Sequence, residues 1–491
     1  METVEAAVEG KRMKRWANKD GSASVFLLCL MAAVIPVFLM LYEHASYRTL
    51  EHAVEWNGEN AGRAVLSYYL PQLSEAYDIY GVWNDETILR SRMERYIEAN
   101  SPFWNGEEGT GLLKARLEEL EIDGSEYSLM DTEQWKKQIR TVMELGTYIE
   151  LLERTELFET LKEVTSLMGE GLDGKEAAGR SQVQRSGQGT VSEEAETEED
   201  SLKEKMEQLL RDKERREEMG QKTVESIGLI EGRVLDDFDM IEALPSRQID
   251  TAYRQKPWDV FRLNLGQMGT VIQDSLYTDL YAVRYFGNFR DQRDGWFACE
   301  LEYILHGKLS DETNFKRTKQ DLFLMRTALN LAAIYRDETM TQMIGAMALA
   351  MAPVPYPAAF GIIAASLSAA EAGNDVKALL QGESVPVLKQ PDQWTLAELA
   401  TDESAASAEE EGELWTMSYE DHLHVLLLLH SQETKLIRMM DLVQLNASKD
   451  LGKEFSLKEC SAGFRWKIRA QLETSTGQHR MYEGEGVSSF E

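Results

Sequence analysis

The chain has 491 residues, of which 43% are hydrophobic, and it carries a formal net charge of −33. This length allows two or three domains, and the ordinary hydrophobic fraction excludes a protein with many membrane spans. The acidic balance argues against binding to nucleic acids and to anionic lipid surfaces, and the three cysteines exclude a disulfide scaffold and offer no zinc spacing.

The first feature along the chain is the uncharged run 21–42. At about 1.5 Å per residue this run is long enough to cross a hydrocarbon core about 30 Å thick. It is longer than the apolar part of a cleaved signal and ends at Glu43 instead of small residues, so we predict a retained transmembrane helix. The tail 1–20 contains five basic and four acidic residues, which predicts a cytoplasmic N-terminus and an extracytoplasmic body of net charge −34. A buried soluble helix is the alternative, but it would need burial on every side.

The region 43–168 is predicted to be helical and extracytoplasmic. It begins with apolar residues at helical spacing, which predict that the membrane helix continues as an amphipathic helix up to Pro71. This stripe consists of Tyr47, Leu50, Val54, Ala61, Val65 and Tyr68. Further helices are predicted in "DETILRSRMERYIEANS" and in the long segment that begins "DTEQWKKQIRTVMEL".

Polar composition predicts two solvated stretches in the middle of the chain. Residues 169–200 lack aromatic residues and end in acidic ones, which predicts a disordered acidic linker. Its Gly169, Gly171 and Gly174 match a dinucleotide-binding pattern by letters only, because they follow a helix instead of a strand. Residues 201–225 are predicted to form a charged helix or coiled-coil arm.

The second half of the chain is predicted to contain a helical core, 226–400. Its uncharged part 339–370 is interrupted by three prolines, and each half is too short to span a bilayer, so a buried helical hairpin is predicted. A re-entrant or second membrane element is the alternative. Residues 401–413 are then predicted to form an acidic loop, 414–480 a helix plus a β-hairpin, and 481–491 a flexible tail. Ser418 and Asp421 fit a capping box at the start of that helix, and the hairpin with its turn is predicted within 455–473, around Cys460. The predicted fold is therefore mainly α, with a small C-terminal β element.

The search for chemistry identifies no catalytic, cofactor or metal site. His422 and His424 would lie about 200° apart on a helix and cannot bind one metal ion together. Glu300 and Glu302 are closely spaced acids without a recognisable partner, so a helix-surface or core hydrogen-bonding role is favoured over an acid–base pair. The sequence alone leaves open whether Cys299 and Cys460 pair.

Several stretches carry a family resemblance. "GSASVFLLCLMAAVIPVFLMLYEHAS" and "RAVLSYYLPQLSEAYDIYGVW" resemble the start of TadE/TadG-type pilus-assembly proteins and of a related bacterial domain-of-unknown-function 5702 family. The stretches "ELEYILHGKLSDETN" and "SYEDHLHVLLLLHSQETKLIRMMDLVQLN" are similar to that second family. The resemblance implies a single-pass envelope protein associated with Tad (Flp) pilus gene clusters. Its partners would be the lipid bilayer, through residues 21–42, and other pilus-assembly or envelope proteins, with self-association also allowed.

The comparison with pilins identifies one candidate processing site. Pilins are cut after a glycine at the cytoplasmic edge of the apolar helix, and a glutamate five residues later balances the new amino terminus of a neighbouring subunit. A cut after Gly21 would make Ser22 the first residue and place Phe26 at the glutamate position. An aromatic ring cannot neutralise a buried amino group, so this departure argues against processing.

The expected function is therefore a non-enzymatic, membrane-anchored structural or assembly component of a Tad-type pilus system. An extracytoplasmic sensor or adhesion module on a signal anchor is the alternative, followed by an anchored envelope enzyme.

Overall fold

The structure is a computed structural model that describes residues 2–100, 113–144, 193–228, 230, 232–249, 271–396 and 416–490. The contacts within the chain divide it into two compact units. Unit 1 comprises Met1–Leu70, Tyr80–Leu129 and Lys458–Phe490, and unit 2 comprises Pro71–Ile79 and Met130–Leu457. Each unit therefore contains segments that are far apart in the sequence.

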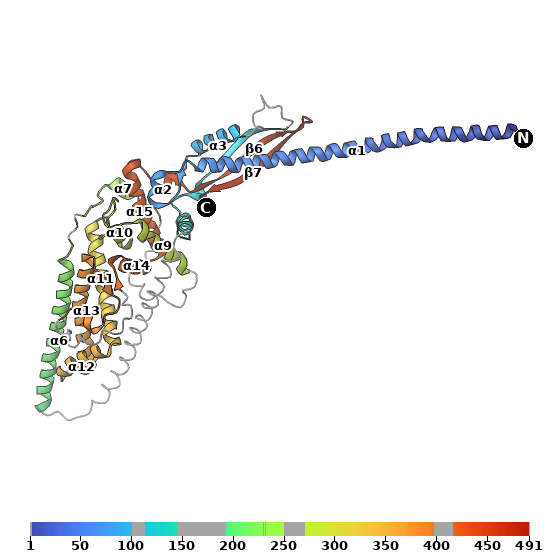
Figure 1. Cartoon of the computed structure of the whole chain (residues 1–491). Helices are drawn as coiled ribbons and strands as arrows, with labels where there is room; N and C mark the ends of the chain where they lie inside the picture. Colours follow the sequence, from blue (N-terminus) through green and yellow to red (C-terminus); the bar gives the residue numbers. More distant parts are fainter. Residues whose placement is uncertain are drawn as a thin grey trace. The chain divides into compact units, whose positions relative to one another are not determined.

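Unit 1 is built around a three-stranded antiparallel sheet in the order β2-β6-β7 (Figure 1). Its strands are β2 (Lys114–Asp123), β6 (Gly463–Glu473) and β7 (His479–Ser489). β6 and β7 pair residue by residue along their whole length, whereas a bulge interrupts the pairing of β2 with β6. Two short strands, β1 (Val82–Trp83) and β5 (Cys460–Ser461), form a separate pair.

Two helices, α1 (Glu2–Leu66) and α3 (Glu86–Asn100), pack on the sheet. Five of the six predicted stripe residues of α1 are buried: Tyr47, Leu50, Val54, Ala61 and Val65. They share one apolar core with Phe464, Trp466 and Ile468 of β6. The prediction that the membrane helix continues as an amphipathic helix is therefore confirmed, except that Tyr68 is 48% exposed because α1 ends at Leu66.

The strands of unit 1 correct three predictions. Strand β2 lies inside the region 43–168 that was predicted to be helical. The prediction was wrong because the glutamates and the bulge of β2 hide the alternation of apolar and polar residues that is typical of a strand. Strand β7 occupies most of the predicted flexible tail 481–491, since β6 supplies its whole set of pairing partners. The long hairpin turns at residues 474–478, not near Cys460 as predicted.

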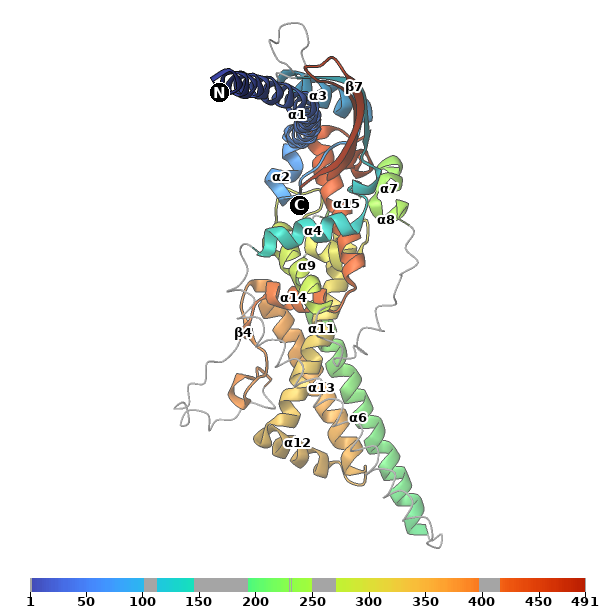
Figure 2. The same cartoon turned by 90° about the vertical axis from the view of Figure 1, so that its right-hand side faces the viewer.

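Unit 2 is helical (Figure 2). Its long helices α6 (Glu193–Glu225), α11 (Asp311–Arg336) and α13 (Tyr356–Gln381) pack together. The other helices are α2 (Pro71–Tyr77), α4 (Thr132–Glu144), α7 (Phe238–Ala243), α8 (Pro245–Gln248), α9 (Val271–Tyr285), α10 (Glu300–His306), α12 (Glu338–Ala350), α14 (Tyr419–Leu428) and α15 (Gln432–Leu451). The short strands β3 (Val385–Pro386) and β4 (Thr416–Met417) pair with each other.

The predicted helical hairpin at 339–370 is confirmed as α12 and α13. Many of its apolar side chains, including Ile344, Phe360 and Ile363, are buried in a core that also receives Leu209 from α6, whereas Leu349 at the end of α12 is 67% exposed. Within the described residues, only α1 is long and apolar enough to cross a membrane. The hairpin is thus a packed element of unit 2.

Helix α6 confirms the charged helix predicted at 201–225 and corrects the alternative of a coiled-coil arm. It packs along α13, and an added Cβ at Gly373 would lie only 2.7 Å from the Cα of Gly220, so the two backbones are in contact at this crossing. The helix also begins at Glu193, inside the predicted linker 169–200. The remaining linker residues and the predicted acidic loop 401–413 lie outside the described residues.

The single helix predicted from Ser418 onward is divided into α14 and α15. The capping box at its start is confirmed, because the Ser418 hydroxyl accepts from the Asp421 amide and the Asp421 carboxylate accepts from the Ser418 amide. The break comes at Ser431, whose hydroxyl accepts from the Thr434 amide at 3.3 Å and caps α15.

Candidate functional site

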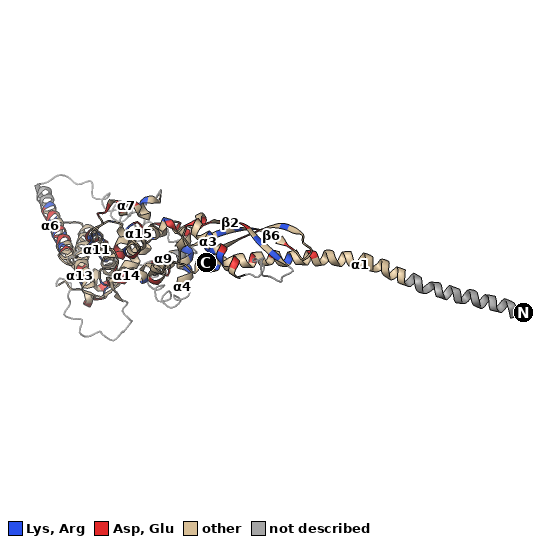
Figure 3. Cartoon of the chain, turned by 90° about the horizontal axis from the view of Figure 1, so that it is seen from above, with Lys and Arg blue, Asp and Glu red and all other residues tan. Residues whose placement is uncertain are grey.

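The membrane anchor is the most distinctive feature of unit 1. The described apolar part of α1 is exposed along its whole length, with Phe38 67% and Met40 76% accessible. Its most apolar window has a mean hydropathy of 2.7, and none of that window is buried. Figure 3 shows that this stretch of α1 carries no charged residue before the helix reaches the sheet. An exposed apolar surface of this size is suited to a bilayer, in agreement with the prediction of an N-terminal membrane helix.

The candidate processing residues all lie within α1. Gly21 and Ser22 belong to the continuous helix, and Phe26 is 69% exposed. The structure thus places an apolar ring, open to the surroundings, at the position where a pilin would carry its glutamate.

Two glycines let the second half of α1 approach the sheet closely. An added Cβ at Gly58 would lie 2.5 Å from the Trp466 ring, and one at Gly62 would lie 2.0 Å from the Ser488 hydroxyl. Trp466 itself is 1% exposed and fills the space between helix and sheet. Glycine at both positions therefore fixes the distance between the anchor helix and the strands β6 and β7.

The turn between β6 and β7 is fastened to α1 just after the anchor. The hydroxyl of Thr474 donates to Glu43 at 2.6 Å, and that of Thr476 donates to each carboxylate oxygen of Glu43 at 2.8 Å. Glu43 is the first charged residue after the uncharged run that ends at Tyr42. The hairpin turn therefore lies beside the end of the membrane segment.

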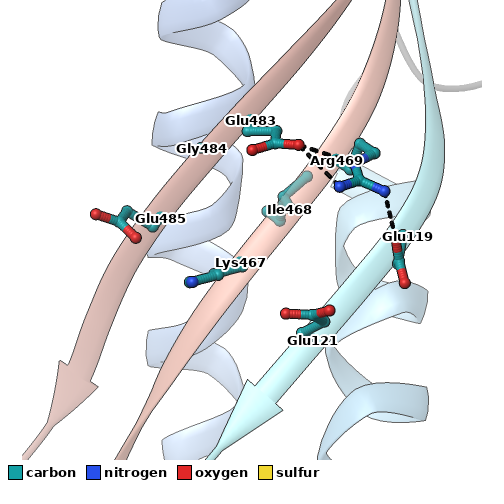
Figure 4. Close-up of a pocket in the computed structure, with 8 residues that line it drawn as sticks. All are labelled: Glu119, Glu121, Lys467, Ile468, Arg469, Glu483, Gly484 and Glu485. Atoms are coloured by element: carbon teal, nitrogen blue, oxygen red, sulfur yellow. Dashed lines mark hydrogen bonds and ion pairs between the residues drawn. The ribbon is translucent and has the colours of Figure 1, made fainter.

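The other face of the sheet carries rows of opposite charge over a shallow concavity of about 420 Å³ (Figure 4). Arg469 on the central strand forms ion pairs of 2.9 Å with Glu119 on β2 and Glu483 on β7. Lys467 lies in register between Glu121 and Glu485. Because these ion pairs are half exposed, each contributes little free energy. Their alternation favours this strand register.

Glu300 and Glu302 are buried in unit 2, where they act as hydrogen-bond acceptors. Glu300 accepts from the Gly287 amide at 2.9 Å and from the Asn446 side chain at 2.6 Å. Glu302 accepts from the Phe289 amide at 2.9 Å and from the Tyr419 hydroxyl at 2.6 Å. Burial raises the pKa of Glu302 to about 7 and also raises the pKa of Glu300. This is the core hydrogen-bonding role that the sequence favoured.

Unit 2 also buries ion pairs that sequence reasoning missed. Lys435 pairs with Asp279, and both side chains are fully buried. Arg326 and Lys389 both pair with Asp375, at 3.0 and 2.5 Å. On the sequence these residues are indistinguishable from charges on helix surfaces, because their partners lie far away along the chain. Such pairs specify which helices meet, and removing one partner leaves a costly buried charge.

The histidine and cysteine side chains of the described residues do not form a metal-binding arrangement. Burial lowers the pKa of His422 to about 4, and its Nδ1 bonds to the Ser418 carbonyl at 2.7 Å. Among the residues that the structure describes, no three His, Cys, Asp or Glu side chains gather as metal ligands. Cys299 and Cys460 are buried, each within its own unit, and neither forms a disulfide.

Comparison with known proteins gives one match. Residues 242–472 match the model of a family of unknown function, DUF5702. This match supports the DUF5702 family for this part of the chain. No curated protein and no solved structure matches the chain.

The DUF5702 region includes all the buried charges described above, from Asp279 to Lys435, and the central strand β6. Helix α1 and the flanking strands β2 and β7 lie outside the match. The match thus covers helices α8 to α15 and strand β6, whereas α1, α6 and the outer strands β2 and β7 lie outside it.

Proposed function

We propose that the protein is a membrane-anchored structural component of the cell envelope that supports assembly or anchoring of a Tad-type surface pilus. It has no catalytic role in this proposal. The N-terminal tail lies in the cytoplasm, residues 21–42 cross the bilayer, and the rest of unit 1 and unit 2 lie on the extracytoplasmic side. Its partners are the bilayer and other pilus-assembly or envelope proteins.

The observation that carries this proposal is the continuity of α1. One helix exposes its apolar first half and packs its second half against an antiparallel sheet through Leu50, Val54 and Trp466. This combination of membrane helix and helix-backed sheet is the general build of pilin-like proteins, and it supports the resemblance to TadE/TadG-type sequences. A continuous helix of this kind holds the sheet at a fixed distance from the membrane, as a scaffold protein requires.

The anchor in this proposal is permanent. Phe26 is exposed within the apolar part of α1 and cannot balance a neighbour's amino terminus in a fibre. We therefore expect the protein to remain in the membrane as an accessory component and not to enter the fibre as a subunit.

Three measurements test the proposal. The protein should resist alkaline extraction from membranes, and its mature N-terminus should precede Gly21. Deletion of the gene should reduce surface pili counted by electron microscopy, and the full chain should restore them. A chain with an unrelated transmembrane helix in place of residues 21–42 serves as a control for anchoring alone. A mature N-terminus at Ser22 would contradict the permanent anchor. Unchanged pili after deletion would contradict the pilus role and favour a sensor or adhesion module.

A further inference from the structure

We propose that the turn between β6 and β7, together with Arg48 and Arg480, rests on the bilayer and binds the phosphate headgroups of anionic lipids. The inference depends on the membrane anchoring of α1 that forms part of the proposed function. It goes further by assigning a lipid-binding surface to the membrane-proximal end of unit 1.

The height of the turn above the membrane follows from its contact with Glu43. The uncharged run ends at Tyr42, and the carboxylate of the next residue accepts the hydroxyls of Thr474 and Thr476. The hairpin end therefore lies alongside α1 on the side of its N-terminal half, as Figure 1 shows. If residue 42 is the last within the hydrocarbon, the turn lies in the headgroup layer, which is about 5–8 Å thick on each side of the core.

Two arginines meet just beyond this turn and share one acid. Arg48 pairs with Glu51 at 3.1 Å, and Arg480 pairs with the other oxygen of Glu51 at 3.5 Å. The Arg480 guanidinium also lies 5.8 Å from the centre of the Tyr47 ring. Two positive charges are thus matched by one negative charge, and this leaves one positive charge without a partner in the group.

The two arginine side chains are more exposed to solvent than the acid that they share, so the excess positive charge lies at the surface. The side chains of Arg48 and Arg480 are 68% and 59% exposed, whereas that of Glu51 is only 10% exposed. Glu43 is covered by the threonine hydroxyls that bond to it. Glu473, at the end of the sheet, lies in register between Lys114 and His479. Glu51 is therefore covered, Glu43 is half-buried and hydrogen-bonded, and Glu473 has a lysine and a histidine as its register neighbours, whereas the guanidinium groups face the surroundings.

The arginines are close enough to reach the lipid. Arg48 is six residues beyond Tyr42, which places its Cα about 9 Å further along the helix axis. Side chains on a helix lean toward its N-terminus, which for α1 is the direction of the membrane. A long arginine side chain covers the remaining distance by extending toward the interface, and its planar group binds phosphate in a bidentate manner.

The acidic charge of the rest of the chain does not prevent this contact. At physiological ionic strength the field of exposed charges is screened within about 8 Å. The surface next to the bilayer is therefore determined by the local groups. These are two exposed arginines, the turn of neutral side chains Thr474 to Gln478, and three acids, Glu43, Glu51 and Glu473, of which Glu51 is only 10% exposed.

The test uses the full chain in nanodiscs, with Cys29→Ala so that introduced cysteines can be spin-labelled. One label is placed at Ser475 in the turn and a control label at Val487 on β7, both of which are exposed. Eight residues of strand separate Val487 from His479, or about 26 Å. A relaxation agent attached to lipid headgroups should strongly affect the Ser475 label and leave the Val487 label nearly unchanged. Equal effects on the two labels would overturn the proposal.

The second arm tests the lipid specificity. The mobility of the Ser475 label should fall when phosphatidylglycerol replaces part of the phosphatidylcholine. The Arg48→Gln/Arg480→Gln variant should lose this difference. The matched control Arg465→Gln, at the far end of β6 and paired with Glu126, should keep it. A difference that persists without both arginines, or a label insensitive to lipid composition, would refute lipid binding and favour a protein partner.

Failure of the anchor and failure of the contact give different results. A chain that alkaline treatment removes from membranes would overturn both the proposed function and this inference. A chain that stays in the membrane with the Ser475 label in water would overturn this inference alone.

Discussion

Because α6 and α13 are in backbone contact, we predict that replacing glycine with alanine changes the stability of unit 2 in opposite directions at two positions of α13. Gly361 and Gly373 both lie within α13, and alanine is favoured over glycine in a helix by about 1 kcal/mol. An added Cβ at Gly361 meets nothing within 4 Å, so Gly361→Ala should stabilise unit 2 by about that amount. An added Cβ at Gly373 would lie 2.7 Å from the Gly220 Cα and 2.8 Å from its carbonyl oxygen. Because the obstacle is backbone, it cannot turn away as a side chain does.

Overpacking of this kind costs about 1–3 kcal/mol, which exceeds the gain in helix propensity of about 1 kcal/mol. We therefore expect Gly373→Ala to destabilise unit 2 by about 1 kcal/mol net. Unit 2 spans roughly 340 residues, and unfolding gains about 2.1 cal/mol/K of entropy per residue, so each 1 kcal/mol shifts Tm by about 1–2 °C. Gly361→Ala should therefore raise Tm, and Gly373→Ala should lower it, by such amounts. Thermal unfolding of the full chain, followed by near-ultraviolet circular dichroism, measures both. Stabilisation by both substitutions would show that α6 does not pack on α13 and would restore the exposed arm that the sequence suggested.

Three further predictions concern buried side chains. Burial raises the pKa of Glu302 from 4.5 to about 7, so the folded state retains the proton longer than the unfolded state does, and stability should fall as pH rises through that interval. Glu302→Gln should flatten this part of the curve of Tm against pH, while the exposed Glu454→Gln should not; an unchanged slope in Glu302→Gln would contradict the assignment. Lys435→Met should cost about 3–5 kcal/mol in urea unfolding because it strands the Asp279 carboxylate, and adding Asp279→Leu should recover most of the loss. A double variant as unstable as the single one would argue against the pairing. Trp466→Ala should destabilise unit 1 by about 3–5 kcal/mol, whereas an exposed substitution such as Arg465→Gln should have little effect on the same urea transition.

The features that the sequence predicted correctly are those encoded within a few helical turns. The buried stripe from Tyr47 to Val65 repeats every three, four or seven residues, and this spacing alone identifies the face of α1 that packs. The α12–α13 hairpin follows from two apolar halves separated by prolines, and the cap at Ser418 follows from two residues three positions apart. Each of these patterns lies within a short segment, so it can be recognised without knowing which distant segment packs against it.

The features that the sequence did not predict depend on partners far away along the chain. Strand β2 reads as a charged helical segment until β6 is placed beside it, more than three hundred residues later. The tail that forms β7 is polar and contains glycines, and only its pairing with β6 makes it a strand. Asp279 and Lys435 are 156 residues apart, and neither differs in its local sequence from an acid or base on a helix surface. The burial of a charged side chain of this kind can therefore be recognised only from the folded structure.

The segments of unit 1 are synthesised at different times, because α1 is made long before the strands that it packs against. The apolar stripe of α1 packs against β6 and β7, whose residues lie at the end of the chain, and Glu43 bonds to Thr474 across 431 residues. When Tyr47, Leu50 and Val54 have just been synthesised, no sheet is yet present to cover them. Their burial and the fastening of the hairpin turn become available only after residues 458–490 have been made. The rigid connection between anchor and sheet is therefore a property of the complete chain, and an interrupted chain would keep a membrane helix with an uncovered apolar face.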